Sequence, residues 1–141
     1  MAWLQSPVVA EAVRDSVHLT STLSALHALG FTCIMGGALF ANLGLLGVLF
    51  PTRPAGEMTA PGSKLIALGL VISLPTGLML VAPRAVTASH NPFFELKMLL
   101  LVTAAIVQFG LQRRASRAMG AVGLTVWGSL ALAACAFILL E

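Results

Sequence analysis

The chain has 141 residues and a net charge of +3, with 58% hydrophobic and only 9% charged residues. Soluble domains carry about a quarter charged residues, so eight basic and five acidic side chains are too few to cover a soluble surface. The length fits one domain, over residues 1–141. The basic residues lie singly or in one short cluster at the ends of apolar segments, which is typical of membrane proteins and argues against nucleic-acid binding. The composition therefore excludes an ordinary soluble fold and indicates a lipid bilayer as the solvent.

The N-terminal segment, MAWLQSPVVAEAVRDSV, lacks the basic start and the uninterrupted apolar stretch of a secretory signal. Pro7 suits the first position of a helix, because its missing N–H would have no intrahelical partner there. The valines that follow share one helix face, and Glu11, Arg14 and Asp15 lie on the opposite face. We predict an amphipathic helix over 7–17 that lies in the membrane interface. The alternative is a soluble extension of the first span.

Four apolar segments follow, each long enough to cross a hydrocarbon core of about 30 Å. We predict spans at about 18–50, 63–82, 92–112 and 118–140. Their connections are short, which makes successive helices antiparallel neighbours. The predicted fold is therefore an all-α integral membrane four-helix bundle with an N-terminal interfacial helix. Pro75 is expected to kink the second span, and Asn91 and Pro92 are expected to begin the third as N-cap and first helical residue.

Basic residues determine the predicted orientation in the membrane. Five of them fall on the side that holds the loops after the first and third spans, and three fall on the other side. Because basic residues favour the cytoplasmic side, both termini are predicted to lie on the outer side. The two sets are Arg53, Lys64, Arg113, Arg114 and Arg117 against Arg14, Arg84 and Lys97.

One ionisable residue, His27, interrupts the apolar first span. Small and polar residues recur with it at intervals of three and four, and these form one stripe: Thr20, Ser24, Ile34, Gly37, Ala41 and Gly44. Small residues mark the packing faces of membrane helices. We therefore predict that His27 points into the bundle.

Three roles are open for His27: a hydrogen bond to a hydroxyl or carbonyl group of a neighbouring helix, ligation of haem or a metal, or proton relay. A relay needs other titratable groups at depth, and the spans offer Asn42, Gln108 and hydroxyls instead. A ligand needs a partner, and His18 lies about 13 Å away along the helix. His90, in the loop before the third span, is predicted on the same outer side as His27. We favour the structural hydrogen bond and keep a cofactor site at His27 and His90 as the alternative.

The other polar and reactive residues of the spans have structural interpretations. Glu95 and Lys97 are expected to anchor the third span at the interface, the alternative being a charged rim of an outer-facing cavity. Cys33 and Cys135 are predicted at similar depth, which leaves open whether they form a disulfide. Trp127 lies in the middle of its span, away from the interfacial belt, and is expected to pack against small residues such as Gly77 or Gly37. We recognise no catalytic motif, so we predict no catalytic residue and expect a non-enzymatic role.

The motif LHALGFTCIMGGALF resembles the first-helix signature of the copper resistance D-type membrane domain, and ELKMLLLVTAAIVQFGLQRR resembles a later helix of that group. Taken together, EAVRDSV, LHALG and NPFFELKMLL resemble a family of small bacterial four-helix membrane proteins of unknown function. The resemblance implies a multi-pass protein of the bacterial inner (cytoplasmic) membrane and, through the larger group, a link with copper handling. The chain departs from that group in having no second histidine within a span and no methionine-rich motif. The matched positions are His27, Gly36, Gly37, Leu96 and Lys97.

We therefore predict a small, non-enzymatic membrane subunit or scaffold that acts as a homo-oligomer or within a larger membrane complex. The alternative is a b-type haem or copper-binding membrane protein for electron or metal transfer, with His27 and His90 as ligands.

Overall fold

The computed structural model describes residues 17–49, 51–54, 57, 59–84, 90–110 and 114–139. Apart from Val17, the predicted interfacial helix over 7–17 lies outside these residues. The described residues form four long α-helices and one short 3-10 helix and contain no strand, which confirms the all-α fold class. The elements are α2 (Val17–Leu46), α3 (Thr59–Val81), η3 (Ala82–Arg84), α5 (Pro92–Phe109) and α6 (Arg117–Leu139).

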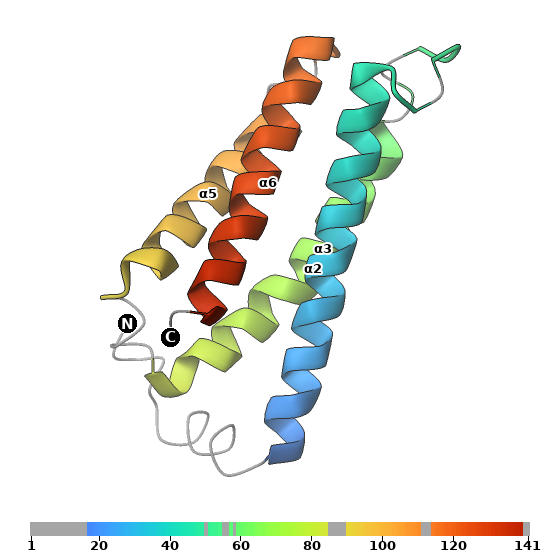
Figure 1. Ribbon diagram of the computed structural model, residues 1–141. Coiled ribbons are helices and arrows are strands. Elements are labelled where there is room, and N and C mark those ends of the chain that lie inside the picture. Colours follow the sequence, from blue (N-terminus) through green and yellow to red (C-terminus); the bar gives the residue numbers. More distant parts are fainter. Residues whose placement is uncertain are drawn as a thin grey trace.

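The four α-helices are each long and apolar enough to cross a membrane. Successive helices run in opposite directions, so the starts of α2 and α5 lie at the same end of the bundle as the ends of α3 and α6 (Figure 1). Helix α2 packs against both α3 and α6, and α6 packs against α5. The structure is thus two antiparallel pairs, α2–α3 and α5–α6, joined through α2 and α6.

Helix α2 ends at Leu46, four residues before the predicted end of the first span. The cause is Gly47, which adopts a φ of +74° that residues with a side chain rarely adopt. The Gly47 N–H donates to the Gly44 carbonyl at 3.1 Å, and the Val48 N–H donates to the Leu43 carbonyl at 3.1 Å. This pair of bonds is the Schellman motif, which caps the last free carbonyls of a helix.

Helix α3 begins at Thr59, four residues before the predicted start of the second span. Pro61 lies in its first turn, where the missing N–H leaves no intrahelical bond unmade. The helix then continues through Pro75 to Val81. Because Pro75 has no N–H, the carbonyl four residues earlier receives no bond from that position.

Helix α5 begins as the sequence predicts. Asn91 is the N-cap, and its side-chain oxygen accepts a hydrogen bond from the Phe93 N–H at 2.9 Å. Pro92 is the first helical residue, and Glu95 lies in the first turn, where the helix dipole favours an anion.

Four glycines, Gly30 and Gly37 on α2 and Gly62 and Gly69 on α3, hold these two helices at very short separation; we call this contact the glycine seam. A Cβ atom built on Gly37 would lie 2.6 Å from the Gly62 carbonyl oxygen, and one on Gly69 would lie 2.5 Å from the Gly30 carbonyl oxygen. Such distances leave no room for any side chain. The glycines on each helix are seven residues apart, a spacing that keeps them facing the partner helix as the two coil around each other.

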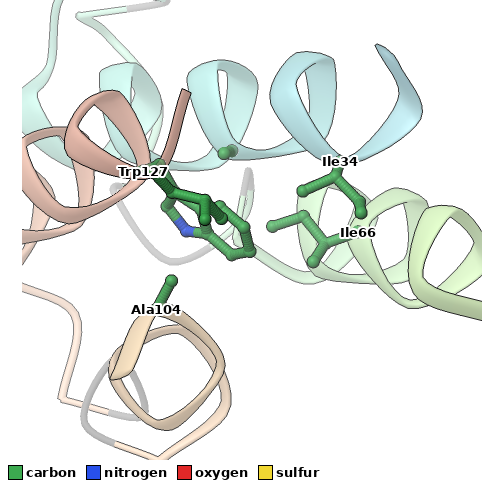
Figure 2. Close-up of a cluster of buried hydrophobic side chains, with 6 residues drawn as sticks. Ile34, Ile66, Ala104 and Trp127 are labelled. Atoms are coloured by element: carbon green, nitrogen blue, oxygen red, sulfur yellow. The ribbon is translucent and has the colours of Figure 1, made fainter. Parts of the chain in front are cut away.

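Trp127 of α6 fills the space where the four helices meet. It is 1% exposed and packs in a cluster with Ile34 and Ala38 of α2, Ile66 of α3 and Ala104 of α5. Figure 2 shows its indole ring reaching between Ile34 and Ile66 on one side and Ala104 on the other. The sequence predicts small neighbours such as Gly77 or Gly37, but the small residues of the cluster are Ala38 and Ala104, because Gly77 faces His27 and Gly37 faces Gly62.

The outward faces of α3 and α5 are strongly apolar. Large hydrophobic side chains with more than a third of their surface exposed follow one another along both helices. Such faces fit a hydrocarbon environment and would be unusual in water. Examples are Leu68, Val71 and Leu74 of α3 and Leu99, Val102 and Ile106 of α5.

Candidate functional site: two interior polar clusters

His27 is half-buried and points from α2 towards α3, as the stripe of small residues predicts. Its Nδ1 atom lies 3.0 Å from the Ser73 carbonyl oxygen, 3.2 Å from the Ser73 Oγ and 3.3 Å from the Thr76 Oγ1. All three atoms belong to one turn of α3. The predicted hydrogen bond from His27 to a hydroxyl or carbonyl group of a neighbouring helix is therefore confirmed.

Gly77 makes room for the imidazole ring. A Cβ atom at this position would lie 2.8 Å from the His27 Cε1 and 3.2 Å from its Nδ1. Thr76 is held in place because its hydroxyl donates to the Ile72 carbonyl at 2.7 Å. The SLPTG segment, which contains Pro75, thus supplies both the polar partners and the space for His27. We call His27, Ser73, Thr76 and Gly77 the His27 cluster.

These contacts determine which ring nitrogen of a neutral His27 carries the proton. A carbonyl oxygen only accepts hydrogen bonds, so the 3.0 Å contact requires the proton of a neutral His27 to lie on Nδ1, where it donates to Ser73. The Nε2 atom of that tautomer carries the lone pair. Ligating histidines in proteins use this arrangement, in which the second ring nitrogen donates to a backbone carbonyl.

Two charged residues lie in the first two turns of α5. Lys97 is half-buried. Glu95 is exposed, which agrees with an interfacial position. His90 is exposed in the turn before α5, and His18 is exposed in the first turn of α2. The contacts of the His27 ring lie on α3, and the described residues hold no cluster of three or more histidine, cysteine or acidic side chains, so His18 and His90 do not form a three-histidine site with His27.

A second polar cluster lies nearer the opposite end of the bundle and is centred on Gln108, which is 2% exposed. The Gln108 Oε1 accepts hydrogen bonds from the Trp127 Nε1 at 3.3 Å and from the Asn42 Nδ2 at 3.4 Å. The Gln108 Nε2 donates to the Ser63 Oγ at 3.0 Å. One residue from each of the four long helices takes part. We call these four residues the Gln108 network.

Helix geometry explains how these side chains meet. Side chains on a helix lean towards its N-terminus, so Gln108, near the end of α5, leans back into the bundle. Trp127, ten residues into α6, leans towards the same level from the other direction. Asn42 is fully buried and also donates to the Ala38 carbonyl of its own helix at 2.7 Å. The network therefore provides hydrogen-bond partners for several buried polar groups that apolar neighbours would leave unpaired.

The described residues contain no group of three or more histidine, cysteine, aspartate or glutamate side chains that could hold a metal ion. Cys33 is half-buried and Cys135 is exposed, and both thiols are free, which answers whether they pair. Within the described part of the chain, one ion pair is seen, between Arg53 and Glu57 at 3.6 Å on the exterior. The hydrogen bonds of the two interior clusters join neutral groups.

The sequence identified His27, Asn42 and Gln108 as interior polar groups but did not link the last two. Their positions along the helices could have suggested the link. Asn42 lies near the end of α2 and Gln108 near the end of α5, and both helices end on the same side of the bundle. Ser63 and Trp127 complete the network only because α3 and α6 begin on that side, so the link required the three-dimensional arrangement.

Comparison with known proteins returns no match to a family model, a curated protein or a solved structure.

Proposed function

We propose that the protein is a small, non-enzymatic, multi-pass subunit or scaffold of the bacterial inner membrane. Four apolar spans and outward-facing apolar helices support its placement in a bilayer. The resemblance to small bacterial four-helix membrane proteins supports the choice of membrane.

The Gln108 network is the observation that carries this proposal. Its amide, hydroxyl and indole groups form hydrogen bonds that connect the four long helices to one another. Buried polar networks of this kind favour one arrangement of the helices over alternatives. A rigid bundle with internally bonded polar groups suits a structural partner, whereas catalysis needs polar groups directed at a substrate.

The test is the assembly state in native membranes. After extraction in mild detergent, a subunit is expected to migrate on a native gel as a discrete assembly well above its own mass of 14.6 kDa. Deletion of this chain is expected to remove or shrink that assembly. A protein that is monomeric at its natural level of expression would contradict the proposal.

The proposed orientation places both termini on the outer side, supported by the excess of basic residues in the loops after α2 and α5. A periplasm-active reporter fused after Glu141 is expected to be active. A reporter that works only in the cytoplasm would reverse the orientation.

One observation favours a second function, a b-type haem or copper site for electron or metal transfer at His27. Because Nδ1 donates its proton to the Ser73 carbonyl, Nε2 carries the lone pair and would be the ligating atom. His90, exposed before α5, would have to move inwards to serve as the second ligand. Haem would supply one-electron redox chemistry to such a site.

The visible spectrum and metal content of the purified protein distinguish the two functions. With haem and copper available during expression, a Soret band or bound copper that is lost in His27→Ala would establish the second function. A colourless, metal-free preparation would exclude it and leave the structural role of His27.

A further inference from the structure

One end of the bundle carries a set of exposed basic side chains. Helix α2 ends there, α3 and α6 begin there, and the loops 51–54 and 114–116 lie there (Figure 1). All four described basic side chains at this end are exposed. We call them the basic face: Arg53, Lys64, Arg114 and Arg117.

Acidic residues do little to neutralise this face. Among the described residues at this end, Glu57 is the one acid, and it is paired with Arg53. The first turns of α3 and α6 contain no acidic residue, although helix N-termini favour acids there. Lys64 and Arg117 instead add positive charge near two helix N-termini, and Glu57 is the one described acidic side chain at this end that offsets them.

Arg117, at the start of α6, lies near the end of α2 at this face. Its Nη2 atom lies 3.9 Å from the position that a Cβ atom on Gly47 would take. The guanidinium group of α6 thus lies beside the C-terminal cap of α2, where a helix dipole favours a cation. Next to it, Gly120 packs against the Asn42 carbonyl and Leu45. Arg117 therefore extends from the place where the start of α6 packs against the end of α2.

Exposed apolar side chains continue directly from the basic face towards the middle of the bundle. On α3, Lys64 is followed by Leu65, which is 37% exposed, and one turn later by Leu68, which is 53% exposed. On α6, Arg117 is followed just over one turn later by Val122, which is 44% exposed. A molecule with an anionic head and acyl chains matches this succession of positive charge and apolar surface, whereas free phosphate matches only the first part.

We propose that the basic face binds the headgroup of an anionic phospholipid whose acyl chains lie on the exposed apolar sides of α3 and α6. This inference goes beyond the subunit function, because it concerns the lipid and requires no protein partner. It also holds for either orientation in the membrane. Clusters of basic residues at membrane boundaries attract anionic lipids with about a fivefold gain in binding per residue.

The experiment compares spin-labelled phosphatidylglycerol with spin-labelled phosphatidylcholine in phosphatidylcholine vesicles that contain the protein. The motionally restricted fraction in the electron paramagnetic resonance spectrum gives the relative affinity. Wild type is expected to prefer phosphatidylglycerol several-fold. The triple variant Lys64→Gln, Arg114→Gln, Arg117→Gln is expected to lose this preference, and Glu57→Gln is expected to increase it. Raising the salt concentration to about 1 M, where the Debye length is about 3 Å, should weaken it.

Lys97→Gln is the matched control, because it removes one positive charge from the other end of the bundle. It is expected to keep the preference, and circular dichroism checks that every variant is folded. Equal affinity for the two lipids, or a preference that the triple variant retains, would overturn the proposal. Competition by millimolar inorganic phosphate would also overturn it, because the face would then be an anion site without lipid specificity. A triple variant with inverted orientation and unchanged lipid preference would show that the charges only direct insertion.

Discussion

The contact between α2 and α3 and the contact of α6 with its neighbours use different means of packing. In the glycine seam, the absence of side chains lets two backbones approach until a Cβ atom on Gly37 would lie 2.6 Å from a carbonyl oxygen. Around α6, one large side chain, Trp127, fills the space and also donates a hydrogen bond. In lipid, helices gain little from hydrophobic burial, so both contacts rely on close fit. The seam is sensitive to added atoms, and the Trp127 contact is sensitive to removed ones.

The largest effect is expected from Trp127→Ala. This change leaves a cavity bordered by all four long helices and removes one donor from Gln108, and comparable core truncations cost about 3–5 kcal/mol of unfolding free energy. Titration with SDS in detergent micelles, followed by far-UV circular dichroism, measures the loss. Trp127→Phe keeps most of the ring and is expected to cost clearly less. Equal losses for the two variants would show that the N–H and not the ring volume carries the contact.

Gly37→Ala tests the seam from the opposite side, by adding one carbon atom. The new Cβ would meet the Gly62 carbonyl and Ile66, so the helices must separate, at a cost of about 2 kcal/mol or more in unfolding free energy. The neighbouring Gly36 is the control, because a Cβ there meets nothing within 4 Å. Gly36→Ala is expected to change the same SDS midpoint little. If both substitutions change the unfolding free energy equally, the effect comes from helix propensity and not from the close approach of α2 and α3.

Gln108→Leu is expected to cost about 1–2 kcal/mol of unfolding free energy, because the Trp127 N–H loses its partner in an apolar interior. The same titration applied to Gln108→Leu combined with Trp127→Phe gives the coupling energy of the pair. The double variant is expected to lose less than the sum of the single variants. Strict additivity would mean that the 3.3 Å contact between Gln108 and Trp127 contributes nothing.

The smallest effect is expected from His27→Ala. Hydrogen bonds between helices in membranes contribute on average about 0.6 kcal/mol, so a loss of about 1 kcal/mol or less is expected from the His27 cluster. His90→Ala changes an exposed residue of the same type and should leave unfolding unaffected. A loss of several kcal/mol in His27→Ala would place His27 among the main supports of the α2–α3 contact.

The sequence predicted the parts of this structure that local pattern determines. Hydropathy is sufficient to predict four helices, and Asn91-Pro92 predicts the start of α5. The three- and four-residue stripe predicts that His27 faces inwards. Each of these depends on residues close together in the chain. Pro51 predicts that the first span continues to residue 50, whereas Gly47 caps α2 four residues earlier.

Pairing between helices was not predictable in the same way. The sequence identifies Gly37 as a packing residue, but its contact with Gly62 depends on the position of α3 along the axis of α2. The sequence also identifies Gln108 as an interior amide, but its contact with Trp127 depends on where along their lengths α5 and α6 pack together. A single sequence determines which residues share a face of one helix. It does not determine how two helices are aligned along their axes, so both contacts required the three-dimensional structure.

The seven-residue intervals between Gly30 and Gly37 and between Gly62 and Gly69 also limit how the length of the chain can vary. One residue inserted into the connection between α2 and α3 leaves both intervals unchanged, and added length in a connection costs little free energy. One residue inserted between Gly30 and Gly37 turns the rest of α2 by about 100°, which moves one glycine away from its partner. Insertions and deletions should therefore be tolerated in the connection between α2 and α3 and rejected within the helices that the seam holds together.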